Sequence, residues 1–275
     1  MKKLITRTVT GGVYVALIIA SLTISSPILF ASLFALLLAL GLWEFQTLTD
    51  SRYSTSTVSK LIDIIGGLLL FFLFYWKTSH PECGFDIFTP YLMYFIIRSI
   101  YQLYIKSPHA LEAWAFSIMG QLYVALPLSL LNILYTSNPY MLLALFLFIW
   151  INDTGAFCVG TLFGKHRLFE RISPKKSWEG FWGGLALCVI ASILFFHFFN
   201  PFFNGPDLST WISLGVIVSV FSTYGDLCES MIKRSLGVKD SGNILPGHGG
   251  ILDRIDSLLF VSPIALLFFM AFANL

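Results

Sequence analysis

Apolar runs of about 20 residues recur along the whole chain, separated by short polar segments. A run of this length crosses a bilayer as one helix, because backbone groups in lipid must be hydrogen-bonded within the segment. The charged fraction of 12% also lies well below the roughly one quarter that is usual in soluble domains. The sequence therefore predicts an all-α polytopic membrane protein of about nine transmembrane helices, near 11–26, 28–46, 61–76, 88–105, 112–134, 139–161, 180–199, 209–232 and 255–273.

Lys and Arg are distributed unevenly between the two sides that these spans define. Cytoplasmic loops of membrane proteins accumulate both residues. With the N-terminus inside, all of the 17 bases except Lys77 fall on the inner side, if Arg98 is counted with the inner end of the fourth span. We therefore predict a cytoplasmic N-terminus and two long cytoplasmic loops, 162–179 and 233–254. A cleaved signal peptide is the alternative for the first span, but apolar sequence continues past Pro27.

The chain is expected to form one integral membrane domain over 1–275. Residues 1–140 would supply N-terminal spans, and 141–275 would carry the catalytic loops. The net charge of +2 is too small to indicate a nucleic-acid partner, since such binding depends on many phosphate contacts. The four cysteines and five histidines lack the spacings of a zinc site, and the cysteines are predicted to be packing residues.

Residues 226–256 concentrate charge that the rest of the chain lacks. If the eighth span stays helical to Lys233, then Asp226, Ser230 and Lys233 share one stripe, with Glu229 beside them. A carboxylate within the membrane costs a few kcal/mol unless it is paired, hydrated or metal-bound. A structural ion pair with Lys233 is the alternative to a functional site, and the charges that follow along the chain favour the site.

A second acidic pair opens the ninth span. Asp253 and Asp256 are three residues apart and would lie on one face of that helix. Two acidic helix ends at the cytoplasmic surface provide the oxygen ligands that Mg²⁺ prefers. Between them, the glycines of P-G-H-G-G at 246–250 would let backbone N–H groups approach an anion, although such a stretch is often only a turn.

The other cytoplasmic loop adds further candidates. Asp153 is an acid inside an apolar span, and Lys175 and Lys176 are suited to bind phosphate. Positive-inside bias alone is enough to explain Lys165, Arg167 and Arg171.

Two other polar residues have simpler structural interpretations. Ser177 is predicted to cap the seventh span, with Trp178 at the interface and Glu179 favoured by the helix dipole. Glu44, beside Trp43 near an inner boundary, is explained by snorkelling or interface exposure.

The segment S-M-I-K-R-S-L-G-V-K-D-S-G-N-I-L-P-G-H-G-G-I-L-D-R-I-D, from Ser230 to Asp256, closely resembles the signature of phosphatidate cytidylyltransferases, also called CDP-diacylglycerol synthases. The segments G-D-L-C-E-S, N-D-T-G-A-F, F-G-K-H and S-P-K-K-S-W-E-G are similar to the family as well, so the resemblance covers about 150–260. Ser177 departs mildly, because Thr is common there. The resemblance implies transfer of a cytidylyl group from CTP to phosphatidic acid, giving CDP-diacylglycerol and pyrophosphate in phospholipid biosynthesis. It also implies a divalent metal, usually Mg²⁺, held by Asp226 and Asp253, and leaves a second cation open.

The residue types suit this chemistry, because an already anionic lipid phosphate needs alignment and charge neutralisation more than a strong base. The expected catalytic residues are Asp226, Lys233, Arg234, Asp240, Asp253, Arg254 and Asp256. The expected substrate-binding residues are Ser230, Lys239, His248, Gly249, Gly250, Lys175, Lys176 and Asp153.

Two other functions remain open from the sequence. A CTP-dependent lipid kinase would release CDP, and an ion transporter would carry acids deeper and on several spans. Clustering of acids at inner helix ends favours the transferase. Its expected partners are CTP, phosphatidic acid and the bilayer of the inner cell membrane, with the active site facing the cytoplasm. A homodimer is left open beside a monomer.

Overall fold

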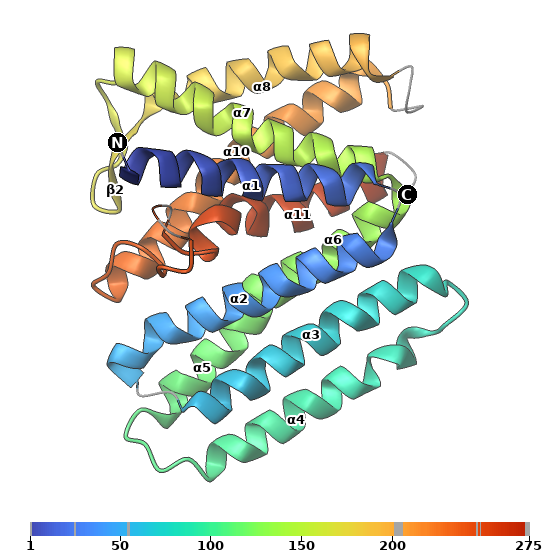
Figure 1. Ribbon diagram of the computed structural model, residues 1–275, viewed down its shortest axis with the longest axis vertical. Helices are drawn as coiled ribbons and strands as arrows, with labels where there is room; N and C mark the ends of the chain where they lie inside the picture. The colour runs from blue at the N-terminus through green and yellow to red at the C-terminus, as the bar shows by residue number, and fades with distance from the viewer. Residues whose placement is uncertain are drawn as a thin grey trace. The chain divides into compact units, whose positions relative to one another are not determined.

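The computed structural model describes residues 2–24, 26–53, 56–200, 206–245, 247 and 249–272, most of which are helical (Figure 1). These residues form two compact units, each discontinuous in sequence. The first is Met1–Thr136 with Ser235–Arg254, and the second is Ser137–Arg234 with Ile255–Leu275. The organisation into one membrane domain stays a prediction.

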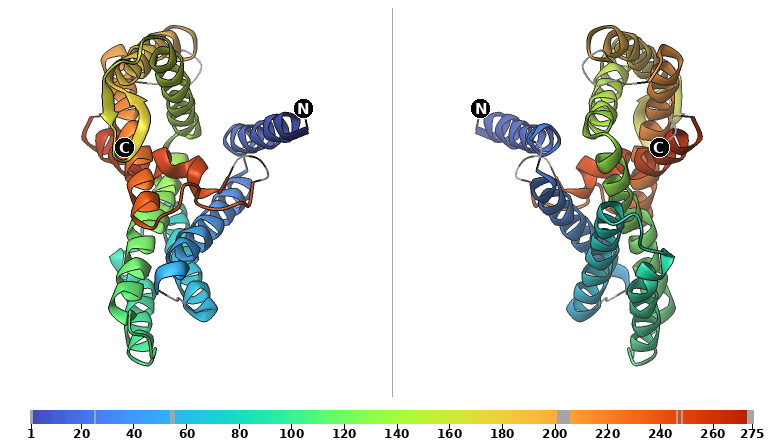
Figure 2. Two further views of the ribbon diagram at one scale, coloured as in Figure 1. Left: turned by 90° about the vertical axis from the view of Figure 1, so that its left-hand side faces the viewer. Right: turned by 90° about the vertical axis from the view of Figure 1, so that its right-hand side faces the viewer.

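The first unit is built mainly from α1 (Lys2–Thr23), α2 (Pro27–Tyr53), α3 (Thr57–Ser79), η1 (Phe85–Phe88), α4 (Thr89–Leu103), α5 (Ala110–Gly120), η2 (Gln121–Ala125) and α6 (Leu126–Ser137). The second is built mainly from α7 (Pro139–Phe163), β1 (Arg167–Phe169), β2 (Ser173–Ser177), α8 (Trp178–Phe198), α10 (Leu208–Ser235) and α11 (Leu252–Phe272). In the first unit, α2, α3 and α4 lie side by side (Figure 1), and α1 meets α2 at an angle (Figure 2).

Seven helices in the described part of the chain are long and apolar enough to cross a membrane: Pro27–Asp50, Thr57–Ser79, Ala110–Ser137, Pro139–Phe163, Trp178–Phe198, Leu208–Ser235 and Leu252–Phe272. The predicted all-α polytopic membrane architecture is therefore confirmed at this level. The other two predicted spans are also helical. α1 contains the shorter apolar stretch Thr8–Thr23. α4 has 15 residues and extends about 22 Å, less than the roughly 30 Å of a hydrocarbon core. The count of nine and the orientation stay predictions.

Side chains next to helix N-termini satisfy amides that have no partner within the helix. The Ser177 hydroxyl accepts a hydrogen bond from the Gly180 amide at 3.2 Å, which confirms the predicted cap of α8. Asp207, which precedes α10, accepts hydrogen bonds from the Ser209 and Thr210 hydroxyls and from the Thr210 amide. These hydrogen bonds lower the pKa of the Asp207 carboxyl below its ordinary value.

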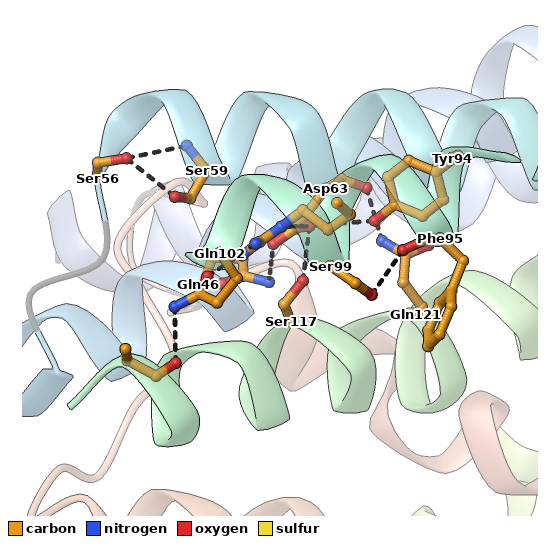
Figure 3. A network of polar contacts seen from close by, with 12 residues as sticks. Gln46, Ser56, Ser59, Asp63, Tyr94, Phe95, Ser99, Gln102, Ser117 and Gln121 are labelled. Carbon is orange, nitrogen blue, oxygen red and sulfur yellow. Dashed lines mark hydrogen bonds and ion pairs between the residues drawn. The ribbon is translucent and has the colours of Figure 1, made fainter. Parts of the chain in front are cut away.

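A buried polar network joins the helices of the first unit (Figure 3). Its centre is Asp63 of α3, whose side chain is fully buried. The Asp63 carboxylate accepts hydrogen bonds from Arg98 Nε at 2.8 Å, from the Ser117 hydroxyl at 2.7 Å and from the Tyr94 hydroxyl at 3.1 Å. Gln46 Nε2 of α2 donates to the same carboxylate at 3.1 Å. Donors from α2, α4 and α5 therefore converge on one carboxylate of α3.

Arg98 completes this network rather than lying at a water-exposed helix end. It is 2% exposed, pairs with Asp63, and donates through Nη1 to Gln102 Oε1 at 2.8 Å. Its charge is thus neutralised among the helices, where an isolated charge would be expensive.

In the second unit, α7 and α8 pack along much of their length (Figure 1). Glycines allow the close approach: a Cβ atom on Gly155 would lie 3.1 Å from the Gly184 Cα, and one on Gly184 would lie 2.5 Å from Asn152 Oδ1. Asn152 also holds α7 against α10, because its amide accepts from the Ser219 hydroxyl at 2.7 Å and donates to the Ser222 hydroxyl at 2.9 Å. Small residues and side-chain hydrogen bonds are the usual means of joining helices in a membrane.

The loop between α7 and α8 forms an antiparallel hairpin that the sequence did not predict. Strands β1 and β2 pair with Arg167 opposite Ser177 and Phe169 opposite Ser173. The pairing register shifts between these two pairs, and within this irregular stretch Lys175 is exposed whereas Lys176 is partly buried.

The Asp63 network generates a stability prediction. Asp63→Ala should lower the free energy of unfolding by about 3–5 kcal/mol, because it leaves Arg98 buried without its anion. Ser117→Ala removes one donor and should cost about 1 kcal/mol. The double variant Asp63→Ala/Arg98→Met should recover part of the loss. Titration of the purified variants with a denaturing detergent measures these differences, and equal effects of Asp63→Ala and Ser117→Ala would contradict the central role of the ion pair.

Candidate active site

Acidic side chains of α7 and α10 in the second unit lie within electrostatic reach of Asp256 on α11. The carboxylate of Asp256, on α11, interacts with the charges of Asp226 and Glu229 on α10 and, more weakly, with that of Asp153 on α7. Asp226 and Asp256 are both partly buried, whereas Asp153 is exposed. Like charges at such a position repel unless cations compensate them.

A close approach of backbones brings α10 and α11 together at this point. A Cβ atom on Gly225, next to Asp226, would lie 2.9 Å from the Asp256 carbonyl oxygen. The Ser257 hydroxyl donates to the Ser222 carbonyl oxygen at 3.1 Å and joins the same two helices. Glycine at 225 thus lets the backbones beside the two carboxylates pack closely.

Asp226 has a basic partner from outside the helices. Lys176 Nζ, on β2, lies 2.7 Å from Asp226 Oδ2, with side-chain exposures of 26% and 34%. The Ser230 hydroxyl donates to Asp226 Oδ1 at 3.2 Å, which confirms the helical stripe predicted from the spacing of these two residues. The pair remains open to water, so both charged groups are accessible to a ligand.

Glu229 and Lys233 form the structural ion pair that the sequence had left as the alternative. Lys233 Nζ lies 2.5 Å from Glu229 Oε2, and both side chains are largely buried. This pair neutralises the second acid of the stripe, whereas Asp226 takes its cation from the hairpin. The two acids of α10 therefore have different surroundings.

Asp253, in the first unit, forms hydrogen bonds with the glycine-containing loop that precedes α11. Its carboxylate accepts hydrogen bonds from the Gly250 amide at 2.9 Å and from the Ser241 amide at 3.1 Å. Gly247 and Gly249 have φ values of +79° and +86°, a region that favours glycine. At the end of this loop, the Gly250 amide therefore faces a carboxylate of the protein.

Glu44 corrects an expectation drawn from the sequence. The prediction of interface exposure is wrong, because Glu44 is 2% exposed. Its Oε2 accepts hydrogen bonds from the Leu252 amide at 2.9 Å and from the Ser241 hydroxyl at 3.2 Å. The sequence carried no signal for these contacts, since Leu252 lies 208 positions further along the chain.

Comparison with known proteins agrees with the motifs on these segments. Residues 5–272 match the model of the Cytidylyltransferase family. The chain belongs to this family. It is 32% identical over 277 residues to the phosphatidate cytidylyltransferase of Haemophilus influenzae, covering 94% of this chain and 95% of that protein. It is 43% identical over 174 residues to the enzymes of the same name from Staphylococcus aureus and Staphylococcus haemolyticus, covering 62% of this chain and 65% of each relative.

The remaining predicted residues of this cytidylyltransferase family member lie mostly at its surface. Lys175, Arg234, Lys239, Asp240 and Arg254 are exposed, and Ser230 is buried. His248 lies outside the described residues.

Among the described residues of this family member, the acids near Asp226 can supply only part of a metal ion's ligands. Across the described ranges, no three His, Cys, Asp or Glu side chains form a group that could hold a metal ion. Mg²⁺ in nucleotide enzymes is often bound by one or two carboxylates, with substrate phosphates and water completing its octahedron. Asp226 with its neighbour Asp256 fits a site of that kind, which a nucleotide would complete.

The two lysines of β2 should differ in their effect on nucleotide binding. Lys176→Ala should raise KM for CTP about tenfold, the loss of roughly 1.4 kcal/mol of interaction with a phosphate. Lys175→Ala should have a smaller effect, because Lys175 is exposed, whereas Lys176 lies within ion-pair distance of Asp226. Steady-state kinetics with varied CTP measures both values. Equal effects of the two substitutions on KM would contradict the prediction that Lys176 is the lysine of β2 that binds the nucleotide.

Proposed function

We propose that this chain is a phosphatidate cytidylyltransferase, which transfers a cytidylyl group from CTP to phosphatidic acid. The products are CDP-diacylglycerol and pyrophosphate. The observation that carries the proposal is the Lys176–Asp226 pair, a cation and a carboxylate 2.7 Å apart beside a second acid, Asp256. The names of the similar bacterial enzymes support the same substrates.

The reaction needs no covalent intermediate with the protein, because the lipid phosphate can attack CTP directly. A phosphate oxygen of phosphatidic acid attacks the α-phosphorus of CTP, and the bond from that phosphorus to the bridging oxygen of the β-phosphate breaks. The electron pair of the broken bond leaves with pyrophosphate. Alignment of two anions and neutralisation of their charge are the main requirements. Lys176 is suited to bind a phosphate of CTP, and the exposed Arg234, Lys239 and Arg254 can attract both anionic substrates.

Carboxylates of the site are proposed to hold Mg²⁺. The bound ion would neutralise triphosphate charge and polarise the phosphoryl oxygens. Asp226 is the proposed ligand on α10, with Asp256 beside it on α11. Asp253 is also a proposed ligand, because the resemblance to the family implies it. Its carboxylate accepts hydrogen bonds from the Gly250 and Ser241 amides as well. A second cation stays open.

The proposed topology has nine spans, a cytoplasmic N-terminus and an active site that faces the cytoplasm from the inner membrane. Its support is the concentration of bases on the inner side. CTP would arrive from the cytoplasm, and phosphatidic acid would keep its acyl chains in the bilayer. Basic residues at that surface also attract an anionic lipid. A homodimer stays a prediction.

Replacement of the acids tests the function. Asp226→Asn and Asp253→Asn should each abolish the CTP-dependent conversion of phosphatidic acid, because the amide cannot neutralise a cation. Asp86→Asn changes an exposed acid of η1 and should leave turnover unchanged. The assay follows pyrophosphate release and labelled CDP-lipid from purified protein.

The same assay separates the competing functions. Release of CDP with a newly phosphorylated lipid would indicate a CTP-dependent lipid kinase instead. Wild-type turnover by a folded Asp226→Asn or Asp253→Asn protein would refute the assignment of that residue. Ion flux without nucleotide turnover would indicate a transporter.

Labelling of single cysteines tests the topology. In a cysteine-free background, Glu82→Cys should react with a membrane-impermeant maleimide in cells whose inner membrane is intact. Lys165→Cys should react only after that membrane is opened. The opposite pattern would reverse the orientation, and labelling of both positions in intact cells would contradict the predicted number of crossings between them.

A further inference from the structure

A buried acid of α2 holds the start of α11 together with the loop that precedes it. Glu44 Oε2 accepts a hydrogen bond from the Leu252 amide at 2.9 Å, and Leu252 is the first residue of α11. Amides in the first turn of a helix have no partner within the helix, and the helix dipole favours an anion there. Glu44 therefore acts as a helix cap supplied by a distant helix. The loop, orange-red in Figure 2, runs close to α2.

Ser241 connects this cap to Asp253. The Ser241 hydroxyl donates to Glu44 Oε2 at 3.2 Å, and it accepts a hydrogen bond from the Asp253 amide at 3.3 Å. The Ser241 amide in turn donates to the Asp253 carboxylate at 3.1 Å. One serine thus joins the two acids, and displacement of Glu44 would release a contact to the backbone of Asp253.

Two glycines leave room for the Glu44 carboxylate. A Cβ atom on Gly250 would lie 2.4 Å from Glu44 Oε2, and one on Gly242 would lie 2.6 Å from Glu44 Oε1. Both distances are too short for a real contact, so any side chain at either position would push the carboxylate or the loop away. Gly250 therefore has a packing reason to be glycine that is separate from anion binding.

The second oxygen of the carboxylate is held at an energetic cost. Glu44 Oε1 is buried and has no hydrogen-bond partner among the described residues. A buried oxygen without a hydrogen-bond partner destabilises a protein, because it has lost its contacts with water. Local violations of this kind are expected where a residue serves function rather than stability.

We propose that Glu44 is a positioning residue of the transferase, which fixes Asp253 and the glycine-containing loop through Ser241 and the Leu252 amide. It acts on the site through these groups and does not touch the substrates. The proposal rests on the proposed function for its kinetic consequences, but the contacts themselves can be tested without turnover.

Hydrogen exchange measures the positioning directly. In full-length protein in detergent micelles, Glu44→Ala should speed exchange of the amides of 241–253 by about tenfold or more, as expected if roughly 1.4 kcal/mol of local stability is lost. Glu44→Gln keeps an oxygen that can accept both hydrogen bonds, so its exchange should stay close to that of the unaltered protein. Glu82→Ala, an exposed acid, is the matched control. Unchanged exchange in Glu44→Ala would overturn the proposal.

Kinetics test the consequence for the site. Glu44→Ala should raise KM for CTP and the Mg²⁺ concentration for half-maximal rate by about tenfold, the size of effect seen when a group behind a metal ligand is lost. KM for phosphatidic acid should change less, and Glu44→Gln should restore most of the difference. A Glu44→Ala enzyme with normal CTP and Mg²⁺ dependence would overturn the proposal. The proposal would also be overturned if Glu44→Gln raised the Mg²⁺ concentration for half-maximal rate as much as Glu44→Ala while the amides of 241–253 exchanged normally. That result would show that the negative charge of Glu44, and not its hydrogen bonds, affects the site.

A second variant keeps the test decisive if Glu44→Ala does not fold. Ser241→Ala removes the connecting hydroxyl and should change exchange and KM for CTP in the same direction, by a smaller factor. No change in either quantity would overturn the proposal. If the unaltered protein shows no turnover with CTP, the proposed function fails, whereas altered exchange in the Glu44 and Ser241 variants would still support the positioning contacts.

Discussion

The low dielectric of a membrane forces each buried carboxylate to be neutralised or hydrogen-bonded, and this constraint organises both units. In the first unit, Asp63 collects donors from three other helices, with Arg98 as its counter-charge. In the second, Glu229 takes Lys233 from its own helix. Asp226 differs from both, since its cation comes from the hairpin and the pair stays partly open to water. Asp226 is therefore the acid best placed to bind a ligand, because the cation that pairs with it is the most exposed of the three.

Local patterns in the sequence predicted the features that depend on neighbouring residues. Apolar runs predicted the membrane helices, and helical spacing predicted that Ser230 would bond to Asp226. The cap by Ser177 followed from its place before an apolar run. Each inference relied on residues within a few turns of one another, where spacing determines which side chains meet.

Contacts between distant segments were beyond such patterns. Arg98 and Asp63 are 35 positions apart, and nothing local to Glu44 indicates that it would cap a helix 208 positions later. The hairpin was missed because its second strand contains a proline and two lysines, a composition more typical of a loop. Contacts of this kind form only when the helices pack. A single sequence can therefore place the acidic residues in one region of the chain, but it cannot tell which of them are structural and which are functional.

The hairpin places a limit on how this region can change in evolution. The pairing of β2 with β1 already contains one register shift, so an insertion or deletion of one residue in β2 would change which residue lies beside Asp226 at the position of Lys176. Substitutions at the tip, around Glu170 and Arg171, leave the register intact. Length should therefore be preserved more strictly than composition in this segment, even though it lies outside the helices.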